Sequence, residues 1–403
     1  MVAKQCSTAI VAIFKDEAPY ILEWIAFHLT IGIDFFYIAD NESSDGTTAL
    51  LEALDKLKII KHIRFRTPND SPPQLPAYEK IMLENKDKHD WFAFIDADEF
   101  IMPQSGRSLD SLLADISTDN KIGAIGLNWA VYGSSNERKY RDGLVLERFQ
   151  SRGEKTLTLN KHFKSLVRSK AYEKTAGNPH SFKLKEGFHY VHTDSRPITN
   201  LVPDVDGLSK DVCWGLFRLN HYVIKSYEEF TNKKNRGRAT KVVNSQENRN
   251  ESFFHEHDVN DVTEKVNADI LASMKERLDA LKVTLASNNS SDIITNTAFV
   301  LNDRLYGCYD SSKTQGQSIE VRGWAFSSAK NDLQYCVRLH DRELLIGSSH
   351  KIKRPDVQSI YQDAPVDCGF MVSCPIESTV SEKDLAFITV FVYINSRFVE
   401  LKN

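Results

Sequence analysis

The sequence lacks the cysteine patterns of a zinc module. Its 403 residues include only six cysteines, which form no Cys-x-x-Cys pair and no zinc-ligand spacing. Four of the six lie beyond residue 300, where a disulfide could form, although we expect reduced thiols in a core. Basic residues are not in excess either, because 51 lysines and arginines face 55 aspartates and glutamates. This balance argues against nucleic acid as a partner.

Long hydrophobic runs are missing as well. The opening stretch, MVAKQCSTAIVAIF, has one short apolar run before Lys15 and Asp16, too short for a signal peptide or a membrane span. We therefore expect a cytoplasmic protein, which could lie peripherally on the inner face of a membrane. What is present, 41% hydrophobic and 26% charged residues, is ordinary for a globular protein, and the length predicts two domains.

The first hundred residues alternate between short apolar runs and amphipathic stretches. Such strand–helix alternation predicts a Rossmann-like, doubly wound and mostly parallel sheet with helices on both faces. Ligands of such sheets bind at the carboxyl ends of the strands. The polar stretches FKDE, IADNESSDG and DADEF follow three expected strands and should converge there. The expected strands are 7–14, 34–40, 59–65 and 91–100, and the expected helices are 17–32, 46–54 and 75–86.

After the first α/β region, the hydrophobic pattern of the chain changes twice. Periodicity fades between residues 134 and 220, and a helix with one apolar face is expected over 262–287. Short alternating runs separated by turn residues follow, which indicates an all-β module, most simply a sandwich. We therefore predict an α/β domain over 1–258, a helical connector and linker over 259–292, and a β-sandwich over 293–403.

The stretch WFAFIDADEF brings three carboxylates to the end of a buried strand. Asp96, Asp98 and Glu99 would repel one another unless a cation or a donor-rich ligand neutralises them. An aspartate pair in this position suits Mg²⁺ or Mn²⁺ that carries a diphosphate. Asp98 would ligate the metal directly, and Asp96 would ligate it too or reach the ribose. The alternative is that these acids cap a loop and face solvent.

The stretch DNESSDGTTALLE also fits part of a calcium loop. Five residues fall on loop positions 1, 3, 5, 6 and 12, but a strand precedes them where an EF-hand needs a helix. We prefer the interpretation in which Asp45 and Gly46 start the second helix. Asp40 would then point from the strand to a base or a ribose. The five calcium-loop positions are Asn41, Ser43, Asp45, Gly46 and Glu52.

These motifs together resemble a known family. The stretches VAIFKDEAPYILEWIAFHLTIGIDFFYIADNESSDGT and WFAFIDADEF resemble the GT-A glycosyltransferases of family 2, and more closely the family 92-like branch. That branch shows K-N/D-E, DN-x-S-x-DGT and D-x-DEF stretches in this order. The resemblance covers about residues 7–240. Further matching stretches are NWAVYGSS (128–135), ERF (147–149), KHFKSLVR (161–168) and HYVIKSYEEFTNKKNRGRA (221–239).

The resemblance implies a metal-dependent, inverting transfer of a sugar from a nucleotide-sugar, with UDP as the expected nucleotide. Asp40 matches the aspartate that binds the base, and Asn41 departs from a second acid common in family 2. Asp96 and Asp98 match the metal motif for Mn²⁺ or Mg²⁺, and His221 would complete the metal shell; the alternative is a core histidine. Further residues expected at the nucleotide-sugar are Lys15, Asp16, Glu17, Lys161 and Lys225, the last in a basic run with Lys233, Lys234, Arg236 and Arg238.

An inverting transfer needs a base for the acceptor hydroxyl. Glu147, in the matched ERF stretch, is the first candidate. It could equally pair with Arg148 or Arg152 as a surface salt bridge. Other acids that stay open are Asp142, Asp194 and Glu99.

Five histidines do not fit a zinc motif, because their spacing lacks the glutamate of a metalloprotease and no cysteine accompanies them. We expect them to line an acceptor cleft or to lie in loops. They are His180, His189, His192, His255 and His257. Trp129 and Tyr132 could stack on a sugar or pack in the core.

The expected acceptor is a glycan or a lipid-linked oligosaccharide in surface polysaccharide biosynthesis. The C-terminal module could bind glycan, mediate self-association into a homo-oligomer, or cover an apolar face. Two other function classes remain. A nucleotidyltransferase would need a glycine-rich loop, and FKDEAP contains no glycine. A nucleotide-sugar or glycan-binding protein would bind without turnover.

Overall fold

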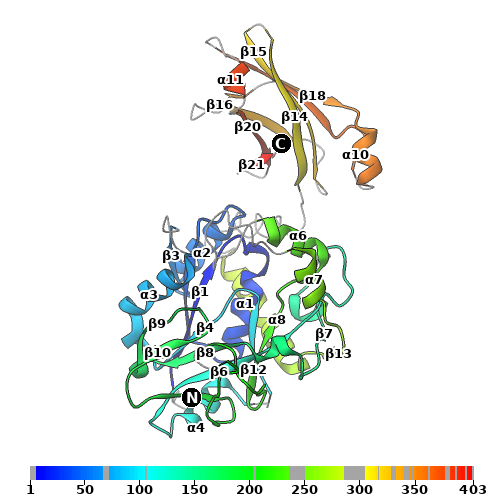
Figure 1. The fold of residues 1–403 in the computed structure, drawn as a ribbon. Coiled ribbons are helices and arrows are strands. Elements are labelled where there is room, and N and C mark those ends of the chain that lie inside the picture. Colours follow the sequence, from blue (N-terminus) through cyan, green and yellow to red (C-terminus); the bar gives the residue numbers. More distant parts are fainter. Residues whose placement is uncertain are drawn as a thin grey trace. The chain divides into compact units, whose positions relative to one another are not determined.

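A computed structural model describes most of the chain, which divides into two compact units, Met1–Thr297 and Ala298–Asn403 (Figure 1). Each unit is considered by itself. The described residues are 6–66, 72–104, 107–202, 206–235, 250–285, 305–315, 317–327, 333–339, 345–346, 348–361, 364–376, 382–385, 388–394 and 397–401.

The first unit is a mixed α/β structure in which η marks a 3-10 helix. Its elements are β1 (Thr8–Phe14), α1 (Ala18–Thr30), β2 (Phe35–Asp40), α2 (Thr47–Lys56), β3 (Lys61–Arg64), α3 (Gln74–Asn85), η1 (Lys86–Lys88), β4 (Trp91–Phe94), β5 (Glu99–Pro103), α4 (Leu109–Ile116), β6 (Ile122–Val131), α5 (Val145–Arg148), β7 (Ser151–Arg152), η2 (Thr158–Lys161), β8 (Phe163–Arg168), η3 (Ser169–Ala171), β9 (Tyr172–Thr175), β10 (Phe182–Leu184), β11 (His189–His192), β12 (Phe217–His221), α6 (Tyr227–Asn235), α7 (Glu251–His257), β13 (Val262–Thr263) and α8 (Ala268–Leu285).

The central sheet has the strand order β3-β2-β1-β4-β8-β6-β12-β5, and β11 pairs with β6. Strands β3, β2, β1 and β4 run parallel, as do β6 with β12 and β6 with β11. Strand β8 is antiparallel to both of its neighbours, and β5 is antiparallel to β12. The predicted α/β class with a mostly parallel sheet is confirmed.

The stretch WFAFIDADEF differs from its prediction as one strand. It forms β4 and β5 on either side of a turn at residues 95–98, and β5 crosses to the far edge of the sheet beside β12. The chain turns where the apolar run gives way to Asp96 and Asp98, whose charges favour a polar turn over a buried strand. The two aspartates therefore lie at the carboxyl end of β4.

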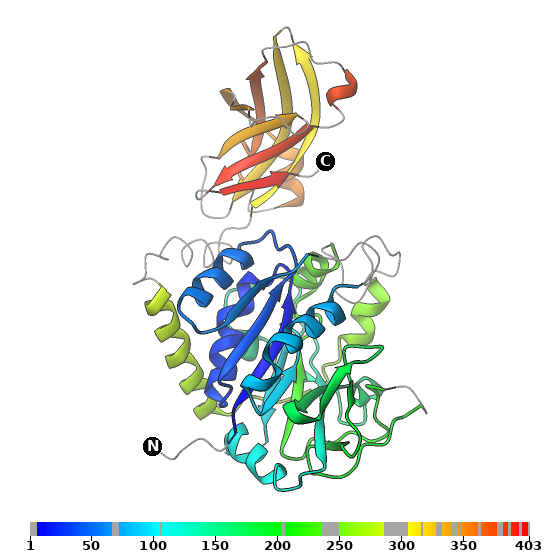
Figure 2. The same cartoon turned by 90° about the vertical axis from the view of Figure 1, so that its left-hand side faces the viewer.

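Two apolar clusters cover the two faces of the sheet. In β1 the alternate residues Ile10, Ala12 and Phe14 face the larger cluster, which includes apolar residues of α1, α2, α4 and α8. Ala9, Val11 and Ile13 face the other cluster with residues of α3. The period of two along the strand places successive side chains on opposite faces. Figure 2 shows the helices on both sides of the strands.

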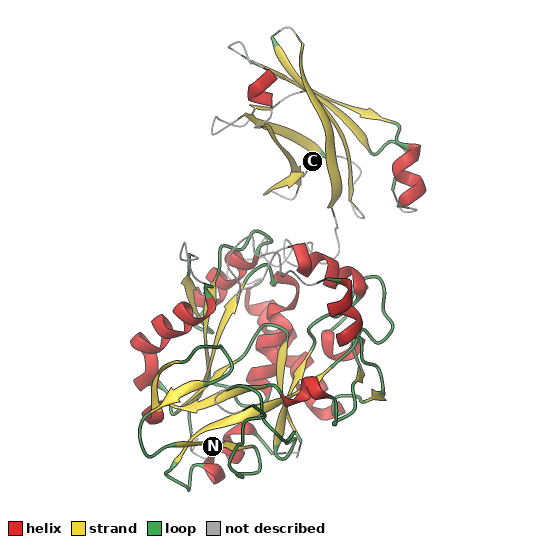
Figure 3. Ribbon diagram, in the orientation of Figure 1, coloured by secondary structure: helices red, strands yellow, loops and turns green. Residues whose placement is uncertain are grey.

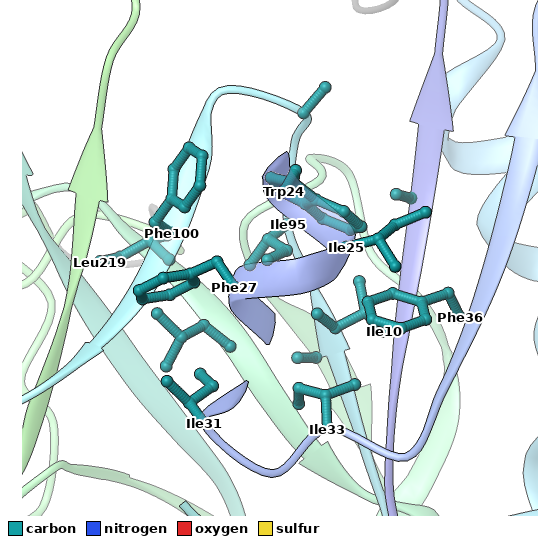
Figure 4. Close-up of a cluster of buried hydrophobic side chains, with 14 of the residues drawn as sticks. Ile10, Trp24, Ile25, Phe27, Ile31, Ile33, Phe36, Ile95, Phe100 and Leu219 are labelled. Carbon is teal, nitrogen blue, oxygen red and sulfur yellow. The ribbon is translucent and has the colours of Figure 1, made fainter. Parts of the chain in front are cut away.

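Helix α1 is central to the larger cluster. Trp24, Ile25 and Phe27 point from it among apolar side chains of the sheet, including Ile10 and Phe100 (Figure 4). The helix ends just before Gly32, whose φ of 104° lies in the left-handed region that favours glycine.

The predicted connector helix corresponds to α8, which packs against α1. Its buried residues Met274, Leu278, Leu281 and Leu285 belong to the larger apolar cluster. Each buried side chain of this size contributes about 1.5–3 kcal/mol of transfer free energy. The helix is thus part of the first unit's core. The predicted linker sequence after it lies outside the described residues.

The second unit contains two four-stranded antiparallel sheets, β14-β15-β19-β18 and β17-β16-β20-β21 (Figure 3). Alternate residues of both sheets, such as Val321 and Val337, form one apolar cluster, which is the packing of a β-sandwich. Its elements are β14 (Leu305–Gln315), β15 (Ser318–Ser327), β16 (Gln334–Leu339), β17 (Leu345–Ile346), β18 (Ser348–Ile352), α10 (Pro355–Ile360), β19 (Gly369–Pro375), α11 (Glu382–Leu385), β20 (Ile388–Ile394) and β21 (Arg397–Leu401).

Candidate active site

A pocket of about 430 Å³ lies in the first unit where the polar ends of several strands meet. Its walls come from the ends of β1 and β4, from β6, β8 and β12, and from α6 and α7. This is the position that a doubly wound sheet offers to a ligand. The lining residues are Ile13, Lys15, Glu17, Gln74, Asp96, Ala97, Asp98, Trp129, Leu159, His162, Lys164, Pro179, His180, His221, Val223, Lys233, Phe253, Glu256 and His257.

The loop after β1 is tied to the loop after β2. Asp16 Oδ1 accepts a hydrogen bond of 2.6 Å from the backbone N–H of Ser44, and Asp45 Oδ2 accepts one of 3.0 Å from the N–H of Ala18. Of the predicted residues in the first loop, Lys15 and Glu17 line the pocket. Asp16 instead holds the two loops together.

Asp40 is buried beneath the second loop and does not line the pocket. Its Oδ2 accepts a hydrogen bond from Thr48 Oγ1, its Oδ1 accepts one from the N–H of Ser43, and His62 Nε2 lies 3.5 Å away. Burial raises the pKa of Asp40, but the bonds from His62, Ser43 and Thr48 outweigh it and lower the pKa to about 2. Asn41 is also buried, and its side chain donates to a backbone carbonyl. Asp40, predicted to bind the base, and Asn41, predicted at the nucleotide-sugar, thus both have partners within the fold.

Asp96 lies in the turn after β4 with its side chain 37% exposed. Its Oδ1 accepts a hydrogen bond of 2.8 Å from Gln74 Nε2, and its Oδ2 accepts one of 2.8 Å from Lys164 Nζ. Both carboxylate oxygens thus have partners from other strands or helices. The burial of Lys164 opposes its charge, but Asp96 and Glu99 raise the pKa of its ammonium above the usual value.

Asp98 is buried and faces two basic side chains. Lys233 Nζ donates to Oδ2, and His221 Nε2 lies 3.7 Å from Oδ1. Burial opposes ionisation of Asp98, but the ammonium of Lys233 holds its pKa well below the usual value. Burial lowers the pKa of His221, so its imidazole is neutral. Its Nδ1 has no hydrogen-bond partner within the part of the chain that the structure describes.

Glu99 lies underneath the turn and is fully buried. Its Oε1 accepts a hydrogen bond of 2.8 Å from Trp129 Nε1, and its Oε2 accepts one of 2.8 Å from the N–H of Asp96. Burial raises the pKa of Glu99 to about 8. It does not line the pocket, so it fixes the turn and the indole rather than meeting a substrate.

One wall of the pocket is aromatic and uncharged. The ring of Trp129 lies 4.8 Å from that of His162, 5.5 Å from that of His180 and 4.3 Å from that of His221. Burial lowers the pKa of His180 to about 3 and also lowers that of His162. These imidazoles are therefore neutral near pH 7. Tyr132, the other predicted stacking residue, is buried in the core.

Three further predicted site residues, besides Asp16, Asp40 and Asn41, do not line the pocket. Glu147 is absent from the pocket lining, and its Oε1 accepts a bond of 2.6 Å from Lys275 of α8. It thus forms a surface ion pair, but with Lys275 and not with Arg148 or Arg152. Lys161 does not line the pocket, whereas Lys164, three residues later, does. Lys225 is buried with its Nζ 4.2 Å from the ring centre of Tyr20. Arg236 and Arg238 of the basic run lie outside the described residues.

Asp98 and His221 suit a divalent cation. Two ligands about 2.1 Å from one ion and at right angles are about 3 Å apart, so a small rotation closes the 3.7 Å separation. Among the described residues, no three His, Cys, Asp or Glu side chains are grouped to hold an ion by themselves. Oxygens of a bound ligand would have to complete the shell, as they commonly do for Mg²⁺ with phosphates. Each carboxylate oxygen of Asp96 already accepts one hydrogen bond, from Gln74 or from Lys164.

The first unit matches a known protein family. The model of glycosyltransferase family 92 matches residues 7–265, which is more than half of the chain. The chain belongs to glycosyltransferase family 92. The matched region ends before α8 and does not include the β-sandwich.

Family 92 proteins of plants are among its relatives. One from Oryza sativa subsp. japonica is 26% identical over 248 residues, which cover 61% of this chain and 38% of that protein. Another from Ricinus communis is 26% identical over 245 residues, covering 60% and 40%. The chain thus matches about two fifths of the length of these relatives. Staphylococcus aureus TarS aligns with 98% of this chain and 77% of its own at 12% identity, but the TM-score of 0.31 is too low to support an inference.

Sequence reasoning missed several pocket residues in this family 92 domain. Gln74, His162, Lys164 and Glu256 were not singled out, although Lys164 lies within the matched KHFKSLVR stretch. A lysine inside the strand β8, where every residue is buried, is a signal for a paired charge.

No helix among the described residues is both long and apolar enough to span a membrane.

Proposed function

We propose that this family 92 chain is a metal-dependent, inverting glycosyltransferase that moves a sugar from a UDP-sugar to a hydroxyl of a glycan or glycolipid. The observation that carries the proposal is the pair Asp98 and His221, 3.7 Å apart in a pocket at the carboxyl ends of the strands. The nucleotide and the inversion rest on the family resemblance. The cation would be Mn²⁺ or Mg²⁺.

The charges of the pocket support a cation. Two of its lysines, Lys164 and Lys233, are already paired with Asp96 and Asp98. A diphosphate brings several more negative charges, which these side chains cannot neutralise by themselves. A bound divalent cation would act as a Lewis acid on the leaving diphosphate. The charged lining residues are Lys15, Lys164 and Lys233 against Glu17, Asp96, Asp98 and Glu256.

Glu256 of α7 is the acid in the pocket that best suits the role of base. It lines the pocket, its side chain is exposed, and no described residue forms a hydrogen bond or ion pair with its carboxylate. A base must reach the acceptor hydroxyl without being neutralised by a neighbour. Glu147 meets neither condition, since it lies outside the lining and is paired with Lys275.

The neutral wall of Trp129, His162 and His180 suits an uncharged sugar ring. An indole face packs against the apolar face of a sugar, and neutral imidazoles can donate or accept hydrogen bonds with hydroxyls. We assign this wall to the transferred sugar or to the acceptor. A lipid-linked acceptor, a place in surface polysaccharide biosynthesis, and a cytoplasmic location at the inner face of a membrane complete the proposal. A glycan-binding or self-associating role of the β-sandwich remains a prediction.

The deciding experiment is thermal stabilisation by UDP and GDP, with and without Mn²⁺. A nucleotide at about a hundred times its dissociation constant adds about 2.7 kcal/mol to the free energy of unfolding. We expect UDP to stabilise the protein only with Mn²⁺, and Asp98→Asn to abolish the effect. Asp115→Asn is the matched control, because Asp115 pairs with Arg107 on the surface outside the pocket. If no nucleotide stabilises the wild type with any metal, the proposal fails.

Assays of turnover distinguish a transferase from a nucleotide-sugar-binding protein and from a nucleotidyltransferase. Slow release of UDP from one of a set of UDP-sugars would identify the donor of a transferase. Stabilisation by a UDP-sugar without any turnover would favour a nucleotide-sugar-binding protein. Formation of a nucleotide-sugar from a nucleoside triphosphate and a sugar phosphate would favour a nucleotidyltransferase.

A further inference from the structure

Lys233 occupies a position that a cation at Asp98 would also need. Its ammonium donates to Asp98 Oδ2 and, over 3.0 Å, to the backbone carbonyl of Val223. The side chain is only 9% exposed. Asp98 Oδ1 faces His221 on its other side. One carboxylate thus lies between an ammonium and an imidazole.

A divalent cation held by Asp98 and His221 would lie next to this ammonium. Two positive charges a few ångströms apart in a largely buried site repel each other strongly. The ammonium must therefore move, or the cation must bind weakly. A lysine has a long and flexible stem, so its ammonium can change partners without a change in the backbone.

Lys164 offers a contrast in the same pocket. It donates to Asp96 and also lies 3.7 Å from the buried carboxylate of Glu99, with its side chain 1% exposed. Removing its ammonium would leave the carboxylate of Asp96 without its counter-ion, which is costly. We therefore regard Lys164 as a fixed part of the turn. Lys233 lies in the last turn of α6 and lines the pocket.

We propose that Lys233 is an exchangeable counter-ion: it holds Asp98 while no cation is bound, and moves to the diphosphate of the donor when the cation and donor bind together. The identity of the anion rests on the proposed function. The exchange makes the binding of cation and nucleotide cooperative. A cation alone must displace the ammonium from Asp98, whereas a diphosphate that binds with the cation gives the ammonium an anionic partner in exchange.

The test is the affinity for Mn²⁺ alone and with UDP, measured by electron paramagnetic resonance of free Mn²⁺. We expect UDP to raise the Mn²⁺ affinity of the wild type at least tenfold. In Lys233→Met, Mn²⁺ alone should bind at least tenfold more tightly than to the wild type, and the enhancement by UDP should shrink. Lys234→Met is the matched control, because Lys234 is the next residue of α6 and does not line the pocket. It should behave as the wild type.

Lys233→Arg is the control for a folding defect in Lys233→Met, because it keeps a positive charge at Asp98. It should retain the weak binding of Mn²⁺ alone. Equal Mn²⁺ affinity in wild type and a folded Lys233→Met would overturn the exchange, as would tight binding of Mn²⁺ alone by Lys233→Arg. Either result would leave the proposed function standing. If Mn²⁺ binds none of these proteins even with UDP, the metal-dependent function and the exchange fail together.

Discussion

The loops after β1 and β2 and the turn after β4 are both rich in acids, yet they use them differently. In the loops, Asp16, Asp40 and Asp45 accept hydrogen bonds from nearby backbone N–H groups. In the turn, Asp96 and Asp98 are paired with side chains of distant elements and line a pocket. Acids bound to backbone shape a loop, whereas an acid bound to a flexible side chain, as Asp98 is to Lys233, can exchange its partner for a ligand.

The largest expected effect is a loss of sugar transfer when an acid of the turn, and not an acid of the loops, is replaced. Asp98→Asn should lower the rate of sugar transfer about 1,000-fold, because the stabilisation of the leaving group is worth several kcal/mol. Asp40→Asn should keep the rate within about threefold wherever the protein is folded, because Asp40 does not line the pocket. Initial rates at saturating donor measure both. Transfer by Asp98→Asn above a tenth of the wild-type rate would contradict the assignment.

The next effect compares two glutamates. Glu256→Gln should lower the rate of transfer about 100-fold or more with unchanged donor affinity, as expected for loss of a general base. Glu147→Gln should change the rate less than about twofold, because an exposed pair such as that with Lys275 contributes little. Rates and donor affinities of both variants test this. If Glu147→Gln is the slow variant, the base predicted from the sequence is correct and Glu256 is not the base.

A third prediction concerns stability in the loop region. Asp40→Asn should lower the free energy of unfolding by about 1.5–3 kcal/mol, since Asp40 accepts hydrogen bonds as a buried carboxylate. Urea unfolding at neutral pH measures the loss. Unchanged stability combined with lost UDP binding would instead support the base-binding role that the family resemblance implies.

The smallest expected effect is the pH dependence of the stability that Asp40→Asn loses. The pKa of Asp40 is about 2, below its ordinary value of 3.8, so its charge stabilises the folded state. The contribution is complete above about pH 4 and is lost as the pH falls towards about 2. The stability difference between wild type and Asp40→Asn should therefore shrink below about pH 4. Urea unfolding at about pH 5, 4 and 3 would show this, and a constant difference would contradict the role of the charge.

Much of the fold could be predicted from local patterns. Continuous apolar runs identified β1, β2 and β4, and alternating short runs identified the C-terminal β-sandwich. Strand β8 was not predicted, because FKSLVR contains a lysine, a serine and an arginine that are all buried. Such residues can lie inside a sheet only when distant partners neutralise or bond them, and those partners are not visible in the local sequence.

The local sequence was enough to predict the class of sheet, the family 92 motifs and the end of the sheet at which the acids gather. Which acids face the pocket depends instead on how distant parts of the chain pack together. Asp40 and Asp98 follow apolar strands in the same way, but Asp40 meets Ser43 of the next loop and Thr48 at the start of α2. Asp98 meets Lys233, 135 residues away along the chain. The strength and the exchangeability of an ion pair depend on burial and on the partner, and both are set by how distant strands and helices pack.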